Sequence, residues 1–169
     1  MSEALTQPVV LDATVLSNFA SSSTIGHLVA ILDHPVAVPA VRKELERGCE
    51  QKYEFLTNAL DHLGDDIDLL DVNHREDNIA SEIHRRLDEG EAESLLGAIE
   101  YGGILATDDL AARRLAADYD VRVTGSVGIL VLGVRAGVIT IDTANECLAV
   151  WKEVRGYYAP VDRVQEILG

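Results

Sequence analysis

The sequence predicts a single α/β domain in which helices cover both faces of a central parallel sheet of about five strands. The chain has 169 residues, the usual size of one domain, and 47% of them are apolar, which is enough for a sizeable core. Short apolar runs alternate with longer segments of helical periodicity. Strands joined by connections of helical length run parallel. We therefore expect residues 1–169 to form one three-layer α/β/α domain.

The expected strands are short apolar runs bounded by turn residues. Acidic residues directly follow two of them, because the first run ends at Asp12 and the fourth at Asp108–Asp109. The runs are 8–11, 36–38, 67–72, 104–107 and 121–125.

The segments between these runs carry apolar residues at helical spacing. The serine run 21–23 suits a turn and a helix N-cap, and Pro39 occupies the favoured first-turn position of the helix that it opens. Gly90 indicates a break before a helix that begins at Glu91. The expected helices are 14–20, 25–32, 39–48, 52–62, 76–87, 91–100, 110–119 and 127–137, followed by a helical region to Gly169.

The charge balance is strongly acidic, with 29 Asp and Glu against 14 Lys and Arg and a net charge of −15. This disfavours non-specific adhesion to nucleic acid or to an anionic membrane, but it allows a nucleic-acid enzyme whose metal ions reverse the local sign. An acidic, lysine-poor surface is typical of proteins that stay soluble in concentrated salt. We therefore expect a halophilic source.

Cysteine usage and the N-terminal sequence point to a reducing compartment. Cys49 and Cys147 are far apart and form no motif, so we expect free thiols. The N-terminal segment lacks the basic and apolar regions of a signal peptide, and no run approaches the ~20 apolar residues of a membrane span. We expect a soluble cytoplasmic protein.

Acidic side chains gather where the expected strands end. Ligands of open parallel sheets bind outside the carboxyl ends of the strands. The acids that can point to this edge are Asp12, Glu44, Glu91, Glu93, Asp108 and Asp109. Their convergence without a compensating lysine or histidine describes a hard-cation site, for which Mg²⁺ or Mn²⁺ is suited.

Each acid taken singly has a simpler interpretation. Asp108 can be a helix N-cap, Glu44 can lie on an exposed helix face, and Glu91 and Glu93 can complement the helix dipole. Asp12 fits such an interpretation least, because a carboxylate that ends a buried run costs several kcal/mol to desolvate unless it is paired or metal-bound.

The motifs resemble those of the PIN-domain family of metal-dependent ribonucleases, in its toxin-like branch. The segment VVLDATVLSNF (9–19) is similar to the family's opening motif, and AVPAVRKEL (37–45) is similar to its second. The segment GEAESLLGAIEYGGILATDDLAARRLA (90–116) is similar to the third and fourth motifs, and the late segments 123–139 and 155–160 resemble that branch's C-terminal region. The resemblance covers nearly the whole chain.

The resemblance implies a role for each site residue. Asp12 and Asp109 would be the central metal ligands, Glu44 and Glu93 would complete the site, and Asp108, the additional acid of that branch, would be a further metal ligand. Thr14 and Thr107 would orient the carboxylates. Glu93 is preferred because Leu96 and Glu100 share its side of the helix, but Glu91, about 200° away around that helix, remains an alternative.

The family also implies a function. PIN enzymes cleave single-stranded RNA with water activated on Mg²⁺ or Mn²⁺, and many are toxins neutralised by a small antitoxin protein. The alternative from another class is a non-catalytic PIN-like module that binds a protein partner.

Other α/β folds with acidic sites fit less well. A haloacid-dehalogenase-type phosphatase requires a second aspartate at position 14, and a receiver domain requires a distal lysine, whereas Lys152 lies beyond the last expected strand. A Rossmann or P-loop protein requires a glycine-rich first turn, which is missing after the first strand.

Apolar residues of two helical regions, 23–32 and 50–63, offer a seam between two copies of the chain. In concentrated salt the chain's self-repulsion is screened, so we expect a homodimer there. The seam residues are Ile25, Leu28, Val29, Leu32, Phe55, Leu56, Leu60 and Leu63.

Overall fold

A computed structural model of the chain describes residues 7–73 and 76–168. The N-terminal residues 1–6, which entered the expectation about a signal peptide, and Gly169 lie outside these ranges. Within them, parallel strands form one five-stranded sheet in the order β3-β2-β1-β4-β5. The strands are β1 (Val9–Leu11), β2 (Pro35–Ala37), β3 (Asp68–Leu69), β4 (Ile104–Ala106) and β5 (Val123–Thr124).

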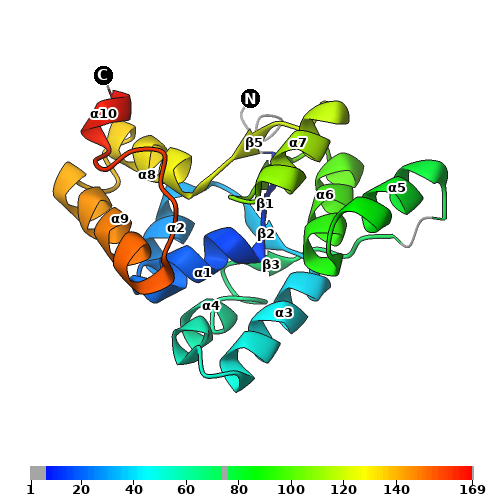
Figure 1. Cartoon of the computed structure of the whole chain (residues 1–169), viewed down its shortest axis with the longest axis horizontal. Coiled ribbons are helices and arrows are strands. Elements are labelled where there is room, and N and C mark those ends of the chain that lie inside the picture. Colours follow the sequence, from blue (N-terminus) through cyan, green and yellow to red (C-terminus); the bar gives the residue numbers. More distant parts are fainter. Residues whose placement is uncertain (1–6, 74–75, 169) are drawn as a thin grey trace.

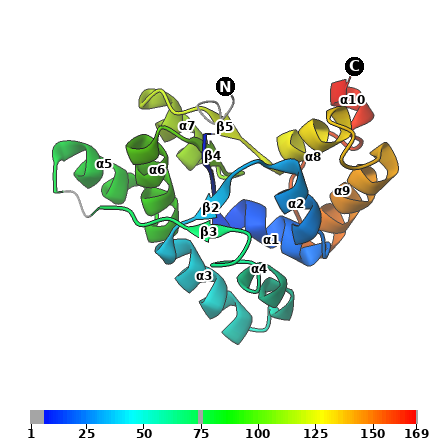
Figure 2. The same cartoon turned by 180° about the vertical axis from the view of Figure 1, so that it is seen from behind.

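Helices cover both faces of this sheet, which confirms the predicted three-layer α/β/α architecture. Helices α5, α6 and α7 lie on one side, and α1, α2, α8 and α9 lie on the other (Figures 1 and 2). None of the helices described is long and apolar enough to cross a membrane. The helices are α1 (Ala13–Ser21), α2 (Ile25–Ile31), α3 (Pro39–Glu50), α4 (Thr57–Leu60), α5 (Asn78–Arg86), α6 (Glu89–Tyr101), α7 (Leu110–Asp118), α8 (Ser126–Arg135), α9 (Ile141–Arg155) and α10 (Gln165–Leu168).

The third and fifth strands are shorter than the predicted runs 67–72 and 121–125, and three helical regions also differ. The single helix expected over 52–62 is a 3-10 turn (Glu54–Leu56) followed by the short α4. The helix expected from Glu91 begins two residues earlier, at Glu89, and runs through Gly90. The C-terminal region is not helical throughout, since an irregular segment separates α9 from α10.

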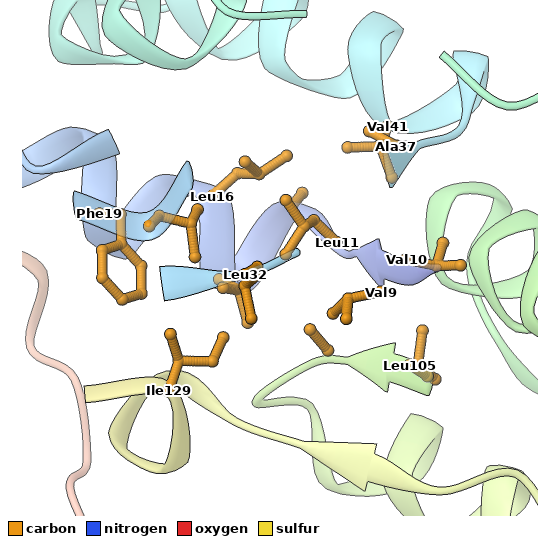
Figure 3. Packing of buried hydrophobic residues seen from close by; sticks show 14 of the residues in the cluster. Val9, Val10, Leu11, Leu16, Phe19, Leu32, Ala37, Val41, Leu105 and Ile129 are labelled. Atoms are coloured by element: carbon orange, nitrogen blue, oxygen red, sulfur yellow. The ribbon is translucent and has the colours of Figure 1, made fainter. Parts of the chain in front are cut away.

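The core forms around β1, the central strand. Val10 and Leu11 are fully buried, because helices cover the sheet on both sides and the strand pairs with β2 and β4. This is why the strand is continuously apolar rather than alternating. Figure 3 shows the side chains of β1 close to Leu105 of β4 and to Leu16 of α1, with Phe19 further along α1.

Helix α9 docks onto the core through Trp151. Its ring is fully buried, lies 4.9 Å from that of Phe19 in an edge-on arrangement, and donates a 3.0 Å hydrogen bond from Nε1 to Ser22 Oγ. Trp151 is therefore a core residue. The thiols of Cys49 and Cys147 are free, as expected, but Cys49 is only half-buried.

Most residues of the expected dimer seam are used inside the chain. Ile25, Leu28, Leu32, Leu56 and Leu63 are buried, and Val29, Phe55 and Leu60 pack against the same core. These positions leave little apolar surface for a second copy.

The parallel strands bring distant segments to one edge of the sheet. The Asp12 amide donates to Ala106 O at 2.9 Å, and the Thr107 amide donates to Thr124 O at 2.9 Å. The residues that follow β1, β4 and β5 therefore lie side by side.

Candidate active site

Asp12 is buried at the centre of the sheet edge where β1, β4 and β5 end. It occupies the N-cap position of α1, yet its side chain does not cap the helix. Instead its Oδ2 accepts hydrogen bonds from Thr107 Oγ1 at 2.7 Å and from Thr14 Oγ1 at 3.1 Å. The residue is 1% exposed, and the burial of its carboxylate raises the pKa.

Two backbone amides fix the direction of these hydroxyl groups. Thr14 Oγ1 accepts from the Asp108 amide at 3.0 Å, and Thr107 Oγ1 accepts from the Asp109 amide at 3.1 Å. Because each oxygen receives an amide hydrogen, each hydroxyl hydrogen is directed to Asp12 Oδ2. The segment after β4 thus holds Asp12 in one orientation.

Glu44 and Glu91 approach this centre from two helices. Burial, together with the charges of Asp12 and Asp88, raises the pKa of Glu44 to about 7. Burial, together with Asp88, Asp109 and Asp12, raises the pKa of Glu91 to about 8. The shifts have the direction expected of carboxylates that are partly desolvated and close to other acids.

The first turn of α6 explains why Glu91 faces the site. Asp88 is its N-cap and forms a capping box with Glu91: the Glu91 amide donates to Asp88 Oδ1 at 2.9 Å, and Glu91 Oε1 accepts from the Asp88 amide at 3.3 Å. Glu93, half-buried, lies about 200° further around the helix. The capping box turns the Glu91 side chain toward Asp88 and the site, and the choice between Glu91 and Glu93 as the third acid stays a prediction.

Gly90 makes room for Glu44. It is buried where α6 meets α3, and a Cβ added to it would lie 2.5 Å from Glu44 Oε1. The glycine that indicated a helix break is therefore inside the helix, where its missing side chain lets Glu44 approach.

Asp109 and Asp108 follow β4 but face different surroundings. Asp109 caps α7, with Oδ2 accepting from the Ala112 amide at 2.8 Å. Asp108 is engaged at both oxygens: Oδ1 accepts from the Ser126 amide at 2.8 Å, and Oδ2 accepts from Ser126 Oγ at 2.5 Å and Asn18 Nδ2 at 3.1 Å. Tyr157 adds a long contact of 3.4 Å to Oδ1. Asp108 is thus held by the protein itself.

The family assignment rests on a match over nearly the whole chain. A model of the DUF3368 family, described as a PIN domain, matches residues 8–169. This chain belongs to the PIN-domain family. A search of curated proteins gives no match. PIN domains are generally nucleases, so membership supports a hydrolytic role on nucleic acid.

The donor set of this PIN domain fits a hard divalent cation, since carboxylate oxygens at one edge of the sheet suit Mg²⁺ or Mn²⁺. In residues 7–73 and 76–168, no three acidic, histidine or cysteine side chains stand close enough together to form a ready-made cage for an ion. The charge of Asp88 acts on Asp12, the charge of Asp12 acts on Glu44 and Glu91, and the charge of Asp109 acts on Glu91.

Several residues around the site of this PIN domain were missed from the sequence. Asp88 had a detectable signal, because Asp88 and Glu91 have the spacing of a capping box. Asn18, Ser126 and Arg155 had none. Asn18 and Ser126 reach Asp108 across 90 and 18 residues, and Arg155 donates to Asn18 Oδ1 across 137 residues.

Proposed function

We propose that this PIN domain is a metal-dependent endoribonuclease that cleaves single-stranded RNA. The observation that carries the proposal is the buried Asp12 carboxylate, held by two threonine hydroxyls, with Glu44 and Glu91 close enough for its charge to raise their pKa values. Such a set of acids matches the family's chemistry of hydrolysis.

Each residue has a separate role in this proposal. Asp12 and Asp109 hold Mg²⁺ or Mn²⁺, and Glu44 and Glu91 complete the binding site. When bound, the ion polarises the scissile phosphate and lowers the pKa of water. Thr14 and Thr107 keep Asp12 in place. Asp108 is not among the proposed ligands, because its oxygens already accept hydrogen bonds from the protein.

The test is cleavage of single-stranded RNA in concentrated KCl. We expect cleavage with Mg²⁺ or Mn²⁺, none with EDTA, and none by Asp12→Asn. Asp118→Asn is the matched control, because it removes one exposed carboxylate at the end of α7. Cleavage that persists in EDTA would contradict the proposal.

The toxin role is a finer part of the proposal and rests on the resemblance to the toxin-like branch. A small antitoxin protein would cover the acidic edge. Expression of the chain should arrest growth of a host cell, and co-expression of a small neighbouring reading frame should restore growth. Growth unaffected by an active nuclease would exclude this role.

The homodimer in concentrated salt and the halophilic source stay predictions. The apolar side chains of residues 23–32 and 50–63 that were expected to form the dimer contact pack against the core of the chain, so they offer little surface to a second copy. Light scattering across a KCl titration measures the oligomeric state directly.

A further inference from the structure

Arg155 is a cationic side chain that forms no ion pair with any residue the structure describes, although the chain has 29 acidic residues and only 14 lysines and arginines. Its guanidinium lies over the Phe55 ring, 5.5 Å from the centroid, and Nε donates a long 3.4 Å bond to Asn18 Oδ1. Lys152, three residues earlier on α9, pairs with Asp162 at 2.5 Å. The Arg155 side chain is exposed, so its guanidinium is accessible to an external anion.

This guanidinium lies beside the proposed catalytic edge. One hollow of about 510 Å³ is lined by Arg155 together with Glu44 and Arg47. A second, of about 240 Å³, is lined by Arg155 together with Thr14 and Asp109. Arg155 therefore stands where the two hollows meet, at the end of α9 and on the side of the proposed metal ligands. In Figure 1 that end of α9 lies next to α1.

The larger hollow also presents an aromatic surface. Tyr53 and Phe55 line it, with ring centroids 6.0 Å apart and ring planes at 64°. Tyr53 is 53% exposed, so a face of its ring is available to a ligand. A nucleotide offers a π face and an anionic phosphate, which complement an aromatic ring beside guanidinium groups.

A protein helix is a poorer match for this hollow. Its lining includes several polar side chains, which an apolar helix face would have to desolvate without compensation. These polar side chains are Ser17, Glu44, Arg47, Gln51 and Arg155.

We propose that the hollow between α1, α3 and the end of α9 binds the nucleotide next to the cleaved phosphate, with Arg155 contacting its backbone phosphate and Tyr53 stacking on its base. The inference rests on the proposed ribonuclease function and deepens it, because it assigns the residues that select and hold the substrate. A binding measurement can separate it from catalysis.

The binding test uses a short fluorescent single-stranded RNA and anisotropy in Ca²⁺ over a KCl titration. Arg155→Gln should weaken binding about tenfold and lower the slope of log affinity against log salt by about 0.7, the value for one phosphate contact on a single strand. Arg155→Lys keeps the charge and should keep the slope. Tyr53→Ala should weaken binding about tenfold with an unchanged slope, because stacking releases no counterions.

Matched controls separate these effects from a general loss of charge or of an aromatic ring. Arg135→Gln and Tyr101→Ala remove similar exposed side chains from the ends of α8 and α6, and both should bind like the unmodified chain. Thermal melting of every variant checks that the fold is intact.

Each outcome bears on one idea. Unchanged RNA affinity in Arg155→Gln and Tyr53→Ala overturns the inference. The same holds if these two variants bind RNA normally and lose only the binding of a protein to the hollow. If Arg155→Gln binds RNA more weakly but the slope of log affinity against log salt is unchanged, Arg155 does not contact a phosphate. A chain that shows the expected binding pattern but no cleavage in Mg²⁺ contradicts the ribonuclease function alone. A chain that cleaves, with the same KM in all variants, contradicts the inference alone.

Discussion

Asp108 and Asp109 are neighbours in sequence at the end of the same strand, yet they lie in opposite environments. Asp108 contacts α8 and α1, where the Ser126 amide and hydroxyl and the Asn18 amide group donate to it. Asp109 lies near Glu91, and its charge raises the pKa of Glu91. The donors that surround a carboxylate decide what it can do, because a saturated carboxylate holds the fold together whereas an unsaturated one can bind a ligand.

The largest expected effect comes from exchanging each of these two aspartates for asparagine. Asp109→Asn should lower ribonuclease activity by on the order of a hundredfold or more, because it removes a proposed metal ligand, while Asn still caps α7. Asp108→Asn should leave most activity but lower the free energy of unfolding by about 2 kcal/mol, because its amide faces hydrogen-bond donors.

Cleavage rates and urea denaturation measure the two effects. The expected loss for Asp108→Asn corresponds to a decrease of about 4–8 °C in Tm. The comparison fails if both variants lose activity equally and neither loses stability.

A second pair of substitutions sharpens the comparison within α6. Glu91→Gln should reduce activity at least about tenfold, because glutamine retains the capping box but not the charge. Glu93→Gln should change activity by less than about twofold, because Glu93 lies on another side of the helix. Cleavage assays at the same salt concentration decide between the two glutamates. A larger loss of activity in Glu93→Gln than in Glu91→Gln would favour Glu93 as the third acid.

The pH dependence of stability should come from Glu44 and Glu91, the two glutamates with raised pKa values near Asp12. Folding raises the pKa values of Glu44 and Glu91 to about 7 and 8, above their value of 4.5 in a model peptide. Between about pH 9 and about pH 5, the folded chain therefore takes up protons that the unfolded chain does not, and stability should increase as the pH falls. Urea midpoints in EDTA test this.

The matched control is the double variant Glu44→Gln, Glu91→Gln, which should show a flatter pH profile over that range. A metal-free chain that loses stability as the pH falls would contradict the assignment. If the double variant gains as much stability as the unmodified chain when the pH falls, groups other than Glu44 and Glu91 are responsible.

The smallest effect is expected at Gly90. Alanine is the better helix former by about 1 kcal/mol, and its Cβ would meet only the movable end of Glu44, so Gly90→Ala should fold well. It should still reduce activity several-fold, because the Glu44 carboxylate has to move from a position 2.5 Å from that Cβ. Activity equal to that of the unmodified chain would show that Glu44 acts from another position.

The sequence predicts the parts of the site that depend on strand ends. Asp12, Thr14, Thr107 and Asp109 lie at the end of an apolar run or within three residues after it, and parallel strands bring such residues to one edge. The hydrogen bonds of both threonines to Asp12 have the geometry that this reasoning requires.

The parts that it missed depend on tertiary packing. Glycine is a poor helix former, so Gly90 indicated a break, but its contact with α3 outweighs that local preference. The partners of Asp108 and the position of Arg155 are set by contacts between the two ends of the chain, such as Arg155 to Asn18, and no local spacing carries that information.

The central position of β1 determines when its two pairings can form as the chain is synthesised. Its partner β4 pairs Leu11 with Ala106, so this strand leaves the ribosome long before its second neighbour exists. Pairings between such distant segments form late. Asp12 is made well before Asp109, so a nascent chain that has not yet reached β4 carries only part of the acidic edge. The proposed metal ligands thus come together only after β4 has been made and has paired with β1.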